Sequence, residues 1–251
     1  MSARRAEATE IVVPQLRRGV TRLRLIGETP MFMNRMSAKA KQQLLIGGRR
    51  KTSVERLALK HNPLAEFRDS AEMIEHGPTA LGLPTIWLKV AMCHAALETA
   101  GITKAAAQRL LFMPGERAAV YGTPQLRMSV VRSADMNRTP DIRTRAYLPR
   151  WAVEIEVQHI LPQLPVQSVV ALACNAGVLV GFGDYRPEKG KGTYGTFRVI
   201  TPEMDDPEWD DLVANHGRAA QEAALAEPEL ADADTADLMA HFFTERDRRA
   251  A

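Results

Sequence analysis

The stretch VGFGDYRPEKGKGTYGTFRV, residues 180–199, joins an apolar helical pattern to a strand pattern through closely spaced glycines. The preceding run, VQSVVALACNAGVLV, has a helical pattern, and Gly181 and Gly183 stand where glycine commonly ends a helix. The alternation over residues 194–200 predicts a strand that closes the unit. Four cations surround the glycines, so we expect an anion to lie beside this loop: Arg186, Lys189, Lys191 and Arg198.

Residues 190–195 also match the G-x-G-x-x-G pattern of dinucleotide-binding loops. In such a site the motif follows a strand and opens a helix, whereas here it runs into a strand. A protein kinase would need a catalytic loop and a metal-binding aspartate further along the chain. The acidic remainder of the sequence offers neither, so we exclude both nucleotide-binding interpretations.

Two motifs about 150 residues apart resemble conserved segments of a known family. The first is GETPMFMNR at residues 27–35, with Asn34 where histidine is common, and the second is GFGDYRPEKGKGTYGTF at residues 181–197. Both are similar to motifs of the RAMP superfamily of RNA-binding proteins. The closest resemblance is to small phage and mobile-element proteins related to the backbone subunit of CRISPR effector complexes.

This resemblance implies a protein that binds single-stranded nucleic acid, RNA in preference to DNA, and that lines up copies of itself in a helical or filamentous assembly. It also implies other CRISPR-type effector subunits as partners. Two alternatives stay open. One is a phage single-stranded DNA-binding or annealing protein on the same fold, and the other is a structural scaffold protein whose basic face binds proteins.

The net charge of +3 hides a strong asymmetry. Residues 201–251 carry 14 acidic and 4 basic side chains, a net charge of −10, and the first 200 residues carry a net charge of +13. A basic body with an acidic tail is typical of nucleic-acid-binding proteins. Cys93 and Cys174 lie in apolar helical runs, which indicates thiols in a reducing compartment. With no signal-peptide pattern and no membrane-length apolar run, we expect a cytoplasmic protein with no membrane partner.

Periodicity predicts strands at about 20–32, 118–132, 145–160 and 194–200, and helices at 85–99 and 165–178. Their order is the β-α-β-β-α-β order of ferredoxin-like and RNA-recognition folds. We therefore predict an α+β protein with an N-terminal arm at residues 1–18, an RRM-like core at 19–201 and an acidic helical tail at 202–251. Basic insertions are expected at about 33–84, including a short helix at 37–46, and at 128–150.

Six arginines lie between residues 127 and 150, opposed only by Asp135 and Asp141. Guanidinium groups bind phosphates through paired N–H groups and also stack on bases. We expect residues 128–150 to form a projecting thumb hairpin, with Met136 near its tip as a wedge between bases. The alternative is that these arginines pair with the acidic tail.

No combination of residues predicts catalysis. The six histidines are scattered, and none stands at metal-ligand spacing from a cysteine or a carboxylate. Asp135 and Asp141 are the only acids beside the arginine-rich segment, and they match no catalytic motif. We therefore predict a non-enzymatic protein with no catalytic residues, no metal and no cofactor.

The candidate nucleic-acid-binding residues come from the first strand, the two motifs, a basic loop at 49–51, the helix at 85–99 and the thumb. For the basic loop, a solvated run of charge is an equally good interpretation. The candidates are Arg22, Arg24, Asn34, Arg35, Arg49, Arg50, Lys51, Lys89, Arg132, Met136, Arg138, Arg143, Arg145, Arg186, Lys189, Gly190, Lys191, Gly192 and Tyr194.

Overall fold

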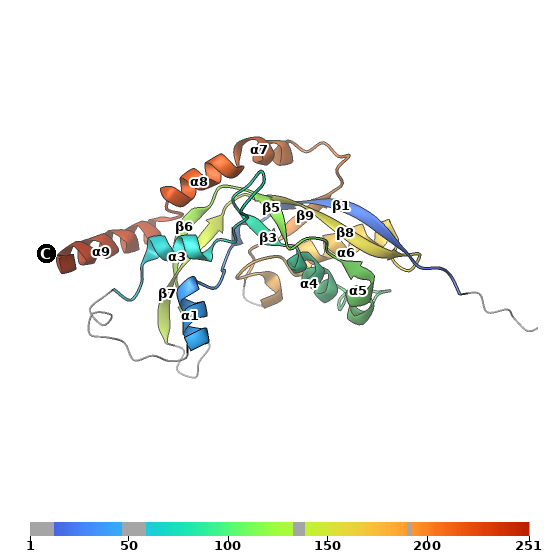
Figure 1. Ribbon diagram of the computed structural model, residues 1–251, viewed down its shortest axis with the longest axis horizontal. Helices are drawn as coiled ribbons and strands as arrows, with labels where there is room; N and C mark the ends of the chain where they lie inside the picture. Colours follow the sequence, from blue (N-terminus) through green and yellow to red (C-terminus); the bar gives the residue numbers. More distant parts are fainter. Residues whose placement is uncertain (1–12, 47–58, 133–138, 190–191, 251) are drawn as a thin grey trace, which may run out of the picture.

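Two antiparallel sheets form the centre of an α+β fold (Figure 1). The computed structural model describes residues 13–46, 59–132, 139–189 and 192–250. The large sheet has the order β3 (Gly82–Pro84), β5 (Arg117–Tyr121), β8 (Ala152–Leu161), β1 (Arg17–Gly27) and β9 (Phe197–Ile200), with β4 (Leu111–Phe112) also paired to β8. The small sheet has the order β2 (Met31–Phe32), β7 (Pro140–Leu148) and β6 (Gln125–Arg132).

The predicted strands at 118–132 and 145–160 are wrong as continuous elements, because each divides between the two sheets. β5 ends and β6 begins around Gly122, which has φ +142°, and a Cβ there would lie 2.4 Å from the carbonyl oxygen of Arg150. β7 and β8 are separated at residues 149–151, which include Pro149. The predicted strand at 20–32 divides likewise into β1 and β2 at the expected Thr29-Pro30 position. The chain therefore passes between the two sheets at one place in both 118–132 and 145–160, where Gly122 lies against Arg150. We call this place the joint between the sheets.

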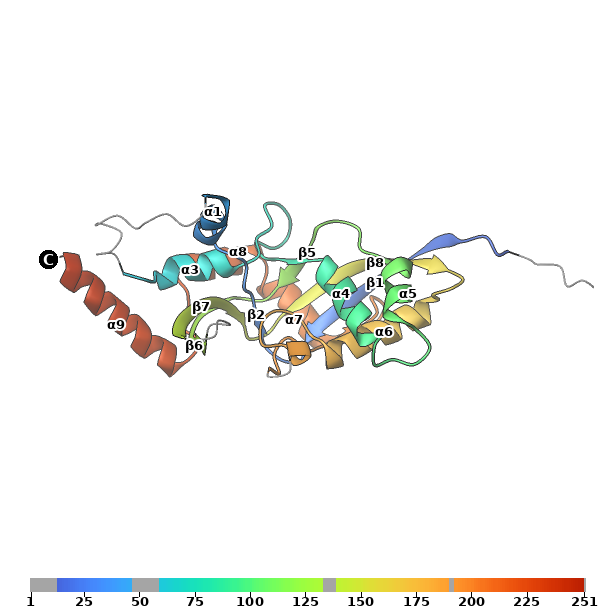
Figure 2. The ribbon, with the colours of Figure 1, turned by 90° about the horizontal axis from the view of Figure 1, so that it is seen from below.

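α4 (Ile86–Ala95) and α6 (Val166–Leu179) pack together over one face of the large sheet, with α5 (Lys104–Leu110) beside α4 (Figures 1 and 2). The predicted helices at 85–99 and 165–178 are thereby confirmed. Buried residues of α6 recur at helical spacing, and the sheet residues that alternate toward the helices are buried: Leu23, Leu25, Val153, Ile155 and Val157. This is the main core of the protein.

The acidic tail forms α7 (Pro207–Asn215), α8 (Arg218–Ala226) and α9 (Ala233–Ala250), so the predicted helical tail is confirmed. α7 lies on the opposite face of the large sheet from α4 and α6 (Figure 1). There Trp209, which is 7% exposed, and Leu212 pack on Ile26, Ala152 and Ile200. α9 packs on β6, where the Thr235 hydroxyl accepts a hydrogen bond from the backbone N–H of Met128 at 3.2 Å. The tail is an integral part of the fold.

α1 (Ala38–Ile46) and α3 (Pro63–Ser70) fill the predicted first insertion. The Ser37 hydroxyl accepts a hydrogen bond from the Ala40 N–H, which confirms the predicted start of α1. α3 packs along β7, whereas α1 exposes Leu44 and Leu45 to 74% and 87%. Within the described residues, no helix combines the length and apolar character needed to cross a membrane.

Candidate functional site

The two motifs that carry the family resemblance lie side by side. The backbone N–H of Asp184 donates to the carbonyl oxygen of Phe32 at 3.2 Å, and the N–H of Gly195 donates to that of Pro30 at 2.8 Å. Gly183 and Gly195 both have positive φ, at +74° and +75°, which glycine adopts without strain. The glycine-rich loop is therefore anchored directly on the segment at residues 27–35.

Gly192 fits the close packing of the loop itself. A Cβ at this position would lie 1.5 Å from the carbonyl oxygen of Tyr185, so a side chain cannot be added without moving the loop. Tyr185 has a positive φ of 57°, and the N–H of Tyr194 donates to its carbonyl at 3.1 Å. The need for glycine at position 192 is therefore explained by close packing within the loop, without a ligand. The neighbouring candidates Gly190 and Lys191 lie outside the described residues.

Four aromatic rings and two arginines gather where this loop meets one face of the small sheet. The Phe32 ring centre lies 5.1 Å from that of Tyr147, 5.6 Å from Tyr185 and 5.0 Å from Tyr194. We call this group the aromatic–arginine cluster. Its members are Phe32, Tyr147, Tyr185, Tyr194, Arg127 and Arg145.

Both arginines of the cluster stack on its rings. The guanidinium carbon of Arg127 lies 4.9 Å from the Tyr147 ring centre, and that of Arg145 lies 5.2 Å from the Tyr185 ring centre. The three tyrosines are half-buried, whereas Phe32 is 2% exposed. Burial raises the pKa of Tyr147, an effect that the charge of Arg127 partly offsets. The tyrosine rings thus form a partly exposed surface backed by two guanidinium groups that are each paired with a carboxylate: Arg145 with Asp184, and Arg127 with Asp232 of the acidic tail at 3.1 Å. The alternative that arginines of this segment pair with the tail is therefore correct for Arg127 and for Arg150, which contacts Glu208 and Asp211.

Asp184 connects the cluster to the candidate Asn34. Its Oδ2 accepts a hydrogen bond from the Asn34 side-chain amide at 2.7 Å and lies 3.1 Å from the Arg145 Nε atom. Arg145 is nearly buried, so this ion pair holds its guanidinium plane against Tyr185. Asn34, Arg145 and Tyr194, three residues proposed from the sequence, are therefore brought together.

Several cations around the cluster have no carboxylate partner within the described residues. Arg143 stands two residues from Arg145 on β7 and so lies on the same face of the small sheet. It is exposed, as is Lys189 at the end of the short helix η1 (Pro187–Lys189). Arg132 at the end of β6 is also exposed, but it stands five residues from Arg127 and so lies on the other face of the small sheet. Arg35, which follows Asn34, is half-buried. Arg143, Lys189 and Arg35 therefore keep their charge available to a ligand beside the cluster, whereas Arg132 offers its charge on the opposite face.

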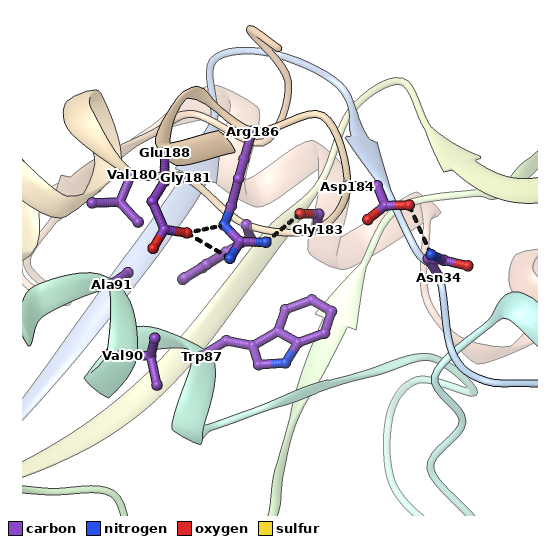
Figure 3. A pocket seen from close by; sticks show the side chains of 11 residues that line it. Asn34, Trp87, Val90, Ala91, Val180, Gly181, Gly183, Asp184, Arg186 and Glu188 are labelled. Atoms are coloured by element: carbon purple, nitrogen blue, oxygen red, sulfur yellow. Dashed lines mark hydrogen bonds and ion pairs between the residues drawn. The ribbon is translucent and has the colours of Figure 1, made fainter. Parts of the chain in front are cut away.

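Arg186, in contrast, is engaged within the loop. Its Nε donates to Glu188 at 2.8 Å, and its Nη1 donates to the carbonyl oxygen of Gly183 at 2.9 Å (Figure 3). His94 on α4 also contacts Glu188. Burial acts to raise the pKa of Glu188, but Arg186 and His94 outweigh it and hold that pKa below its usual value. This Arg186–Glu188–His94 network ties the loop to α4.

A cavity of about 310 Å³ lies between the glycine-rich loop and α4 (Figure 3). Trp87, Val90 and Phe182 form its apolar wall, and its polar groups come from the loop and from Asn34. The Trp87 ring lies below Arg186, Gly183 and Asp184 in this view. Because Asn34 and Asp184 line it, the cavity adjoins the aromatic–arginine cluster.

The remaining candidates lie elsewhere. Arg22 and Arg24 are on the face of the large sheet that α7 partly covers, 3.7 and 3.0 Å from Glu156 and Glu154. Lys89 lies on α4, with its Nζ 5.3 Å from the Phe112 ring centre. Five further candidates besides Gly190 and Lys191 lie outside the described residues: Arg49, Arg50, Lys51, Met136 and Arg138.

Three aromatic members of the cluster were not predicted from the sequence, Phe32, Tyr147 and Tyr185, and Arg127 was noted among the six arginines but not named as a candidate. One signal for Tyr147 exists, since residues 143, 145 and 147 alternate along a strand and must share a face. Among the described residues, no group of three or more histidine, cysteine, aspartate and glutamate side chains is placed to hold a metal ion. No protein-family model matches the sequence, and no curated protein is similar to it.

Proposed function

We propose that this chain binds single-stranded nucleic acid, RNA in preference to DNA, across the aromatic–arginine cluster, and that copies assemble along the strand. The observation that carries the proposal is the surface of half-buried tyrosines backed by Arg127 and Arg145 and flanked by cations that no described carboxylate neutralises. Proteins that bind single strands combine aromatic rings for base stacking with positive charge along the backbone path. Both components are present here within one surface.

The strand order supports a ferredoxin-like core. Taken in chain order, β1, β5, β8 and β9 with the helices α4 and α6 follow the β-α-β-β-α-β order, and all pairings in the large sheet are antiparallel. The exposed sheet face on which RNA-recognition folds stack bases is here partly covered by Trp209 of α7. We therefore propose that the strand follows the small sheet and the glycine-rich loop.

Assembly along the strand draws support from α1. Leu44 and Leu45 expose most of their apolar surface, and among the described residues no other element packs closely on their helix. The preference for RNA, and a place among CRISPR-type effector subunits, rest on the resemblance of the two motifs.

The test is a binding titration of the full chain with labelled single strands of about 20 nucleotides, long enough to exceed a typical single-protein site. RNA and DNA of the same unstructured sequence are compared by fluorescence anisotropy. Tyr194→Ala should weaken binding by about 1–3 kcal/mol, because each stacked base contributes about that much. Arg143→Glu should weaken binding further at low salt, because it turns a phosphate contact into a repulsion.

Arg109→Glu is the matched control. Arg109 is also an exposed arginine without an ion pair in the described structure, but it lies on α5, at the opposite end of the molecule from β7 (Figures 1 and 2). Its affinity should stay close to that of the unmodified protein. Equal losses of affinity for Arg143→Glu and Arg109→Glu would mean that binding depends only on the net charge of the protein, which would refute the proposed surface. Tighter binding to DNA than to RNA would favour the single-stranded DNA-binding alternative.

A further inference from the structure

The cavity between the glycine-rich loop and α4 has the size of a site for one nucleobase. Ligand pockets usually enclose about 300–1,000 Å³, and this cavity of about 310 Å³ lies at the lower limit of that range. The half-buried Trp87 and the buried Phe182 supply an apolar wall, with ring centres 6.4 Å apart and planes inclined at 48°, so that the Trp87 ring is the flat surface of the cavity. A single planar ring system can stack there, whereas a dinucleotide has no room.

The polar groups at the rim come from two parts of the loop: Asp184, which is an acceptor, and Arg186, which is a donor paired with Glu188 (Figure 3). Asp184 uses its Oδ2 atom for Asn34 and Arg145, so its Oδ1 atom has no partner in the described structure. Arg186 makes three contacts, to Glu188 through Nε and Nη2 and to Gly183 through Nη1. Of its five N–H groups, one on each terminal nitrogen has no acceptor among the described residues.

This division fits one base better than the others. Guanine presents two donors, N1–H and the N2 amino group, on its Watson–Crick edge, and two acceptors, O6 and N7, on its other edge. The free Oδ1 atom of Asp184 matches the donors, and the spare N–H groups of Arg186 match the acceptors; the Asn34 oxygen points away from the Trp87 ring (Figure 3). Adenine and cytosine place an acceptor beside their amino group on the Watson–Crick edge, which a carboxylate oxygen repels.

We propose that this cavity binds one unpaired guanine of the bound strand, stacked on Trp87 and recognised by Asp184 and Arg186. The inference rests on the proposed function, since the strand is held at the adjoining aromatic–arginine cluster. A paired guanine cannot use the site, because its Watson–Crick edge is occupied in a duplex. The protein would therefore select where along a single strand it binds.

The test uses three labelled RNA strands of the same length: uridine only, uridine with one central guanosine, and uridine with one central adenosine. We expect the full chain to bind the guanosine strand at least about tenfold more tightly than the adenosine strand, the discrimination typical of a bidentate base contact. Asp184→Asn should bring the ratio of the two affinities close to one, because the amide oxygen stays toward the donors of Asn34 and Arg145 and its NH2 group takes the place of Oδ1, where it repels the guanine N–H groups. Asp210→Asn, on the exposed side of α7, is the matched control and should keep the ratio.

The outcomes separate this inference from the proposed function. Equal affinity for all three strands overturns the guanine site and leaves strand binding intact. If no strand binds, the proposed function is refuted. Titration of the same protein with guanosine 5′-monophosphate then tests separately whether the cavity binds guanine. Quenching of tryptophan emission by guanosine but not adenosine monophosphate, lost in Trp87→Phe/Asp184→Asn, then supports a guanine site. No difference between the two nucleotides overturns it.

Discussion

Gln221 on α8 connects the acidic tail to the body through four hydrogen bonds and makes a fifth within the tail, and its side chain is fully buried. Its Oε1 accepts from the backbone N–H groups of Ala80 and Leu81 at 2.8 and 2.9 Å. Its Nε2 donates to the carbonyl oxygens of Val120, Gly122 and His216 at 2.7, 3.0 and 3.1 Å. One amide thus satisfies backbone groups from three parts of the chain.

We expect Gln221→Ala to lower the free energy of unfolding by about 3–5 kcal/mol. A hydrogen bond contributes about 1 kcal/mol net, and a buried group left without a partner costs about 1–3 kcal/mol. Five lost bonds set an upper value near 5 kcal/mol, and water entering the space lowers it. Glu222→Ala is the control on the same helix, because its exposed ion pair with Arg218 contributes at most about 1 kcal/mol.

Urea unfolding followed by circular dichroism measures the loss. With a slope of about 3 kcal/mol per M, the midpoint should fall by about 1–1.7 M for Gln221→Ala. Gln221→Glu adds a pH test, because its second oxygen would face three carbonyl oxygens and raise the glutamate pKa in the folded state. The variant should therefore be more stable at low pH and lose stability as the pH rises above about 4.3. An unchanged midpoint for Gln221→Ala would show that the Gln221 hydrogen bonds do not stabilise the docking of the tail.

Three further outcomes are expected. The Arg198 hydrogen bond lowers the pKa of Asp206 in the folded state. The Arg198–Asp206 pair therefore stabilises the docking of α7 above about pH 3.9, and this stabilisation is lost as the pH falls further. Emission from Trp209 should shift to the red in that range, and a spectrum independent of pH would contradict this. Arg143→Gln should reduce the salt slope of RNA binding by about 0.7, and an unchanged slope would mean that Arg143 contacts no phosphate. Gly195→Ala should lower the thermal midpoint more than Gly101→Ala. Both glycines have positive φ, but a Cβ at Gly195 would lie 1.9 Å from a carbonyl oxygen, whereas nothing lies within 4 Å of a Cβ at Gly101. Equal losses would assign the cost to the positive φ alone.

The regular elements of the core could be predicted from the sequence because their burial is periodic. α6 buries residues at helical spacing, including Val169, Leu172 and Ala176, and β8 buries every second residue. Such patterns follow from one face being packed and the other exposed. They determine where an element lies and which face it buries.

The joint between the two sheets could not be predicted from these patterns. Gly122 and Pro149 mark it in the sequence, but the alternation of buried residues continues on both sides of each. Which sheet each segment joins depends on contacts with residues far away in the sequence, such as Leu126 with Leu230 and Gly122 with Arg150. A local pattern has no information about those partners.

The site was predicted in part, because a cation can be identified from the sequence but its ion pairs cannot. Arg22 and Arg24 stand opposite Glu156 and Glu154 only once the register of β1 and β8 is known. The same holds for Arg186, whose carboxylate partner is two residues away but turns back onto it through the short helix η1. Composition therefore overestimates the charge that the folded surface offers to a ligand.

The position of Gln221 also has a consequence for how the chain reaches its native state. The backbone groups that it satisfies lie 99 to 141 residues earlier in the sequence, apart from that of His216. While the protein is being synthesised, the backbone N–H groups of Ala80 and Leu81 lack their Gln221 acceptor until α8 has been made. Contacts of such long sequence separation slow folding, and exposed strand edges promote aggregation in the interval. Expression at low temperature or with a chaperone should therefore favour soluble product.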